Sequence, residues 1–166
     1  MASMDLKRAA FGCAAALLAL AIWLAWLWQP ERQIRLHTAH LLGGIERRSW
    51  KRVGDFLADD YSDRWGHDKA FVIEGLRQVF GNFLFLRIEH RVIRASVSGS
   101  EGACEAQVKI SGQGGPIAQL VATKVNGLAE PFTFTWRQRS GWPWDWDLSR
   151  VDHPTLNPDA EWLRSL

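Results

Sequence analysis

The chain has 166 residues, of which 47% are hydrophobic and 23% charged, with a net charge of +2. Beyond residue 28, 18 Lys and Arg residues nearly balance 17 Asp and Glu residues, so the sequence does not predict the strongly basic face of a nucleic-acid-binding protein. Residues 29–166 are enough for one domain of ordinary size.

An apolar stretch without charge, residues 9–28, lies near the start of the chain. A helix of this length spans about 30 Å, the thickness of a bilayer's hydrocarbon core. Trp23, Trp26 and Trp28 lie at its end, where indole rings suit the membrane interface. We expect an uncleaved membrane anchor that contacts lipid through residues 9–28, and Pro30 is expected to stop its helix.

The charges beside this stretch give a weak indication of its orientation. Lys7 and Arg8 precede it, and Arg32 and Arg35 follow it, so the count of basic residues is balanced. A charged amino-terminal tail before an apolar run usually stays in the cytoplasm, and long domains are translocated largely regardless of charge. We therefore expect residues 1–8 in the cytoplasm and the remaining domain in the periplasm, anchored in the inner membrane.

Helical periodicity dominates the first half of the remaining chain. Apolar residues recur at spacings of three and four between Ile34 and Arg48, which predicts an amphipathic helix. Ser49 is placed to cap a shorter second helix that ends near Leu57. Asp68 is placed to cap a third helix that continues to Phe83.

After residue 83 the apolar pattern changes to an alternation with period two, which predicts strands. Strands are predicted over residues 84–97, 104–110, 117–125, 132–136 and 144–148. In the first strand the apolar parity changes between Val92 and Ile93, which predicts a bulge and a bend. Residues 112–116 are predicted to be a loop. Residues 154–166 are expected to form a tail in which Asn157 starts a short helix.

Helices followed by antiparallel strands predict an α+β fold, and the pattern resembles the nuclear transport factor 2-like superfamily. The features that carry the resemblance are a helix pair ending at residues 56–61, a helix at 68–83 that feeds a long bent strand, and a hairpin beginning at 132–141. The resemblance implies a cone-shaped, curved antiparallel sheet packed on three amino-terminal helices, enclosing a pocket. We place this domain at residues 29–153. Homodimerisation through the sheet is common in the superfamily and is expected here.

The resemblance alone does not select a function, because the superfamily holds both enzymes and non-enzymes. The catalytic positions of its ketosteroid isomerases would fall near Leu41, Trp65 and Thr133, none of which matches, although Asp63 is close to the second. Its dehydratases use a histidine and tyrosines, whereas this chain has one tyrosine, Tyr61. Some membrane-anchored members are assembly subunits of type IV secretion machines, and their layout is similar.

Four residues are candidates for ligand binding: His90, Tyr61, Trp136 and Asp60. His90 shares the alternation of the apolar residues around it, so we expect it to point into the pocket, where an imidazole could act as acid or base. The alternative is a core or edge histidine satisfied by one hydrogen bond. Tyr61 beside Asp60 could bind a polar ligand, or it could cap the core with its hydroxyl at the surface. Trp136 belongs to a strand that either lines the pocket or fills it.

Other polar and aromatic groups leave alternatives open. His37 and His40 share a helix face, but no further ligands stand at matched spacing, so we expect no metal, and no motif indicates a cofactor. Trp142 and Trp144 lie at a predicted hairpin tip. Their rings could pack in the fold, stack on sugars, enter the membrane boundary or contact a partner.

We find no catalytic set in the sequence, so we expect a membrane-anchored module that binds a protein partner or a small apolar ligand without catalysis. The first alternative is a pocket enzyme of isomerase, dehydratase or hydrolase type that uses His90, Tyr61 or Asp60. The second alternative is an assembly subunit of a secretion complex.

Overall fold

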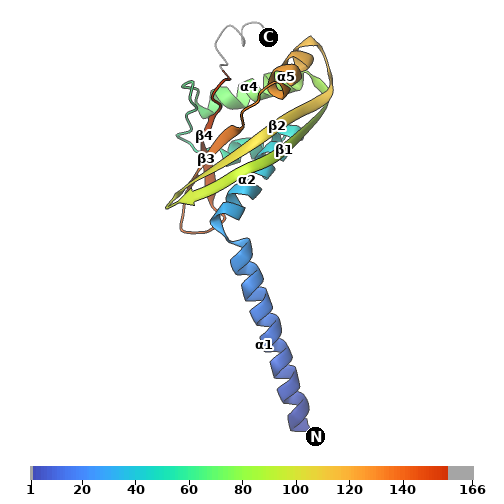
Figure 1. The fold of residues 1–166 in the computed structure, drawn as a ribbon, viewed down its shortest axis with the longest axis vertical. Helices are drawn as coiled ribbons and strands as arrows, with labels where there is room; N and C mark the ends of the chain where they lie inside the picture. Colours follow the sequence, from blue (N-terminus) through green and yellow to red (C-terminus); the bar gives the residue numbers. More distant parts are fainter. Residues whose placement is uncertain (1, 157–166) are drawn as a thin grey trace.

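The computed structural model describes residues 2–156, and it describes side chains for residues 12–24 and 26–156. Helix α1, Ala2–Leu27, projects away from an α+β body (Figure 1). Pro30 lies in the first turn of the next helix, so the predicted break before it is confirmed. Within the described residues, no helix combines the length and the apolar character needed to cross a bilayer.

The predicted amino-terminal helices are present as α2, Pro30–Glu46, α3, Trp50–Phe56, and α4, Lys69–Gly81. The Asp68 carboxylate caps α4 by accepting a 2.8 Å hydrogen bond from the Phe71 amide, as expected. Ser49 occupies the cap position of α3, but its side chain makes no capping hydrogen bond. The inward face of α2 buries Ile34 and Leu41 and forms the floor of the core.

A four-stranded antiparallel sheet covers these helices in the order β1-β2-β3-β4. The strands are β1, Phe83–Ser98; β2, Glu101–Gly114; β3, Phe132–Gln138; and β4, Trp146–Asp152. The long strands β1 and β2 run together over α2 (Figure 1). Their register shifts between Val92 and Arg94, which leaves Ile93 without a partner residue in β2. This confirms the predicted bulge, at the point where the apolar parity changes.

The strand predicted over residues 117–125 is wrong, because this segment is helix α5, Pro116–Asn126. Ala118 and Val121 are buried, at the spacing that puts them on one face of a helix. Pro116 in the first turn is also compatible with a helix start. Asn126 fixes the end of α5 to β2, because its side chain bonds the Ile110 amide at 2.8 Å and the Ile110 carbonyl at 2.7 Å.

The predicted loop at residues 112–116 is also partly wrong, since β2 continues to Gly114. A Cβ atom at Gly112 would lie 2.1 Å from the Phe85 carbonyl oxygen, and one at Gly114 would lie 2.4 Å from the Asn82 carbonyl oxygen. These glycines therefore permit close pairing with β1 where a turn was expected. The helix predicted to start at Asn157 lies outside the described residues.

Candidate functional site

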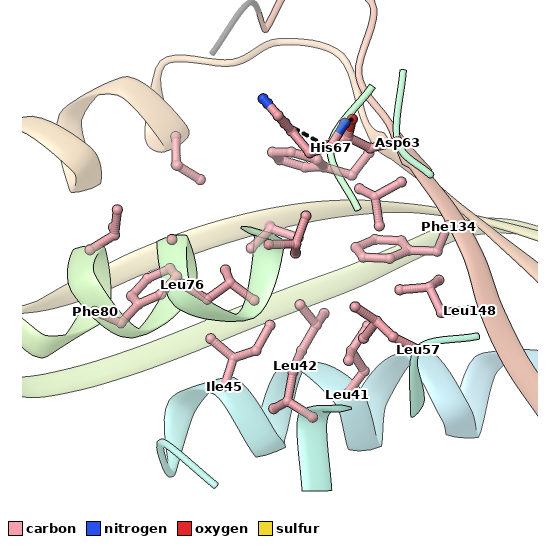
Figure 2. Close-up of a pocket in the computed structure, with 18 of the residues that line it drawn as sticks. Leu41, Leu42, Ile45, Leu57, Asp63, His67, Leu76, Phe80, Phe134 and Leu148 are labelled. Carbon is pink, nitrogen blue, oxygen red and sulfur yellow. Dashed lines mark hydrogen bonds and ion pairs between the residues drawn. The ribbon is translucent and has the colours of Figure 1, made fainter. Parts of the chain in front are cut away.

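A cavity of about 280 Å³ lies between the helices and the sheet. Its walls come from α2, α3, α4, α5 and all the strands, and they are mostly aliphatic and aromatic (Figure 2). Among the lining residues are Leu41, Leu42, Ile45, Leu57, Leu76, Phe80, Phe134 and Leu148. Because small-ligand sites are concave and mostly apolar with a few polar groups, this cavity is the candidate site.

The polar groups of the cavity come from the loop between α3 and α4. Figure 2 shows Asp63 and His67 together at the end of the cavity opposite α2. His67 Nδ1 lies 2.9 Å from Asp63 Oδ2, and Asp63 Oδ1 accepts hydrogen bonds of 2.9 Å from the Trp65 amide and 2.8 Å from the His67 amide. The carboxylate of Asp63 is buried, so it acts as an acceptor that fixes both the loop and the imidazole ring.

This pairing sets the chemistry of His67. A carboxylate accepts the hydrogen bond, so Nδ1 donates and Nε2 carries the lone pair in the neutral ring. The ring stacks on Phe71, with 4.2 Å between centroids and 15° between planes. His67 is therefore held in one orientation and presents a nitrogen that can accept a proton or a hydrogen bond.

Tyr61 also lines the cavity. Burial raises the pKa of its hydroxyl above the usual value, and the charge of Asp63 raises that pKa further. The hydroxyl therefore stays protonated at neutral pH and remains a hydrogen-bond donor. Of the predicted candidates, Tyr61 is the one that the structure places in the cavity.

The other predicted candidates lie elsewhere. His90 keeps the alternation of Ile88 but is exposed and does not line the cavity, so the expectation that it points inward is wrong. Val92 and Val97, farther along β1, still pack against the core, so the exposure of His90 is local to its position in the strand. Asp60 is exposed and paired with Arg137, and this hydrogen bond holds the pKa of the carboxyl below its usual range. Trp136 is fully buried, and its ring belongs to the core instead of the cavity wall.

His67 was not among the predicted site residues, and Asp63 was noted as a neighbour of an expected isomerase position. The signal was present as an aspartate and a histidine four residues apart, directly before the capping residue Asp68. Periodicity does not detect such a pair, because it lies in a loop.

His37, which shares a helix face with His40, lies against two aromatic rings. The ring of His37 packs edge-on against Phe56 and Trp136, with centroids 5.9 Å and 5.5 Å away. Among the residues that the structure describes, no group of three or more His, Cys, Asp or Glu side chains could hold a metal ion.

No protein-family model matches the chain, and a search of curated proteins finds no match. Solved structures do resemble it. A candidate dehydratase of the NTF2-like (nuclear transport factor 2-like) family from Streptomyces avermitilis has a TM-score of 0.55 at 18% identity, covering 76% of this chain and 96% of that one. The domain has the NTF2-like fold.

Two further structures support the NTF2-like fold. A conserved protein from Planctomyces limnophilus has a TM-score of 0.56 at 12% identity, covering 74% of this chain and 93% of that one. A candidate scytalone dehydratase from Novosphingobium aromaticivorans has a TM-score of 0.52 at 10% identity, covering 72% of this chain and 79% of that one. At these identities the likeness concerns the fold alone.

Proposed function

We propose that this protein is a membrane-anchored NTF2-like domain that binds a small, mostly apolar ligand carrying one polar group. The observation that carries the proposal is the cavity itself, with an apolar wall and one hydrogen-bonded Asp63–His67 pair at its end. The apolar body of a ligand would bury against the helices and the sheet. Its polar group would lie at the end of the cavity that His67 and Tyr61 line.

The proposed anchor is the stretch at residues 9–28. Its described part presents large apolar side chains to the surroundings: Leu17, Leu18 and Ile22 are 66%, 63% and 62% exposed. A contiguous exposed apolar surface marks a site of membrane or protein contact, and the absence of charge over residues 9–28 favours lipid. We place the anchor in the inner membrane and the domain in the periplasm.

The test of ligand binding uses the full chain in lipid nanodiscs. Small molecules extracted from the purified protein would be identified by mass spectrometry. Naphthol, which has an apolar body and one hydroxyl, would be titrated while the methyl resonances of Leu76 and Leu148 are followed. We expect these resonances to shift on addition of naphthol.

A matched pair of variants locates this binding. Leu76→Trp fills the cavity and should abolish the shifts of the cavity methyl groups. Leu84→Trp adds the same ring at a side chain that is 86% exposed and should leave them unchanged. If no small molecule is extracted from the purified protein and naphthol shifts no methyl resonance, ligand binding is contradicted.

A second candidate function, acid–base catalysis on a bound ligand, is favoured by the same Asp63–His67 pair. A histidine oriented by a carboxylate is a suitable general base, and solved structures with this fold include candidate dehydratases. Once the ligand is identified, its conversion by the parent protein would be compared with conversion by His67→Gln. If the parent binds the ligand without converting it, the proposed ligand binding stands and acid–base catalysis is rejected.

A further inference from the structure

The tip of the β3–β4 hairpin lies against the end of α1. The rings of Trp28 and Trp144 are 5.7 Å apart between centroids, and Trp142 stacks on Trp144 at 5.0 Å with 21° between planes. Trp142 is 61% exposed, Trp144 47% and Trp28 40%. We call these three residues the tryptophan cluster. It joins the residue that directly follows α1 to a loop more than a hundred residues away in sequence.

The hairpin tip is built to hold its rings outward. Gln138 Nε2 donates to the Trp142 carbonyl at 2.9 Å, and Arg139 pairs with Asp145 at 2.7 Å across the base of the loop. Trp146 turns inward, where it is buried and donates to the Pro143 carbonyl at 2.8 Å. Two of the three closely spaced indoles therefore remain outside the core in an ordered loop, although burial would be the usual arrangement for such large rings.

The junction with α1 is also well defined. Gln33 Nε2 donates to the Leu27 carbonyl at 2.8 Å, and the Arg32 guanidinium lies 3.4 Å from the centroid of the Trp26 ring. Only Trp28 and Gln29 separate α1 from α2. This short connection keeps the hairpin close to the point where the apolar helix ends.

We propose that Trp142 and Trp144 insert into the headgroup layer of the bilayer, as a second membrane contact beside the anchor. This inference rests on the proposed anchoring by residues 9–28. If Trp28 lies at the interface, its contact with Trp144 brings the hairpin to the same depth. Indole rings prefer this layer, because their apolar body and their N–H group are both satisfied there. The contact fixes how the domain is oriented on the membrane.

The test measures the depth of the hairpin in the full chain, reconstituted in phosphatidylcholine vesicles containing phosphatidylglycerol. A Cys13→Ser background leaves Cys104, which is buried, and an environment-sensitive fluorophore is attached through Gly141→Cys. The matched control is Gly81→Cys, at the end of α4, a helix that lies on the side of the body remote from α1 (Figure 1). At both glycines an added Cβ meets nothing within 4 Å.

We expect the fluorophore at position 141 to show a blue-shifted emission and quenching by lipids with a nitroxide just below the headgroups, and the fluorophore at 81 to show neither. Adding Trp142→Ala and Trp144→Ala should remove the shift at 141, whereas Leu84→Ala should not.

Flotation of the vesicles tests the anchor separately. If the chain floats but position 141 behaves like position 81, the hairpin contact is overturned and the anchor stands. If the chain does not float, the anchor and the hairpin contact are both overturned. A blue shift at 141 without lipid quenching would point to a protein contact and would also overturn the proposal.

Discussion

The indole nitrogen of Trp136 donates a 3.1 Å hydrogen bond to the hydroxyl of Thr38, and both side chains are fully buried. Thr38 in turn donates to the Ile34 carbonyl at 2.9 Å. The bond therefore joins β3 to α2 at the centre of the core. A polar contact at this depth specifies the packing of sheet on helix more strictly than apolar contacts do.

Replacing Thr38 by valine keeps the shape of the side chain but removes the acceptor for Trp136. We expect Thr38→Val to lower the free energy of unfolding by about 1–3 kcal/mol, the cost of an unsatisfied buried donor. Urea unfolding of the full chain in detergent would measure this change. Thr38→Ser keeps the hydroxyl, so its free energy of unfolding should fall by less than that of Thr38→Val. Equal losses in both variants would show that the hydrogen bond is not the cause.

Among the glycines of β2, Gly112 is the one where an added Cβ would come closest to β1. Because an added Cβ would lie 2.1 Å from the Phe85 carbonyl oxygen, Gly112→Ala must displace backbone, and we expect a loss of about 1–3 kcal/mol. Gly141→Ala is the control, because an added Cβ there meets nothing within 4 Å. Its stability should stay close to that of the parent. Thermal unfolding of both variants would decide whether the strand extension depends on this glycine.

His37 should make the stability of the domain depend on pH. Burial lowers the pKa of His37 below its usual value, so the folded state binds a proton there less readily than the unfolded state does. Neutral His37 contributes to the stability of the folded state. This contribution is fully present above the pKa of about 6.5 that the residue has in the unfolded state, and it is lost as the pH falls through the lower pKa of the folded state. The free energy of unfolding, measured with urea, should fall more in this pH window for the parent than for His37→Gln. An identical pH dependence in the two proteins would contradict the prediction.

His67 should control the polar end of the cavity. We expect His67→Gln to keep the fold and to weaken naphthol binding by about 0.5–1.5 kcal/mol, the value of one hydrogen bond. The methyl titration described for the parent would measure the change. His90→Gln replaces an exposed histidine that does not line the cavity and should bind like the parent. Weaker binding in His90→Gln would show that the site lies elsewhere.

The regular elements were largely predictable because their apolar periodicity is local. The helices before residue 83 and the bulge near Ile93 follow from which side chains are apolar. Segment 117–125 was mistaken for a strand, because it is short and largely apolar and its helical spacing is visible only when Ala118 and Val121 are known to share a buried face.

The site was less predictable than the fold, because it is made by contacts that periodicity does not encode. Tyr61 was identified from its chemistry, whereas His67 became a candidate only once its ring was seen on Asp63. His90 failed for the opposite reason: it shares the parity of the buried residues Leu86 and Ile88, yet its side chain is exposed. Homodimerisation stays a prediction.

The bulge in β1 comes from a single residue without a pairing partner in β2. Val92 pairs with Ala106 and Arg94 with Glu105, so Ile93 is the extra residue in β1. A chain shortened by this one residue would pair without interruption and keep the same faces on both sides of the join, but its strand would lose the local kink. The bend of β1 is thus tied to strand length, and a single-codon deletion would remove this bend without changing any side chain that lines the cavity.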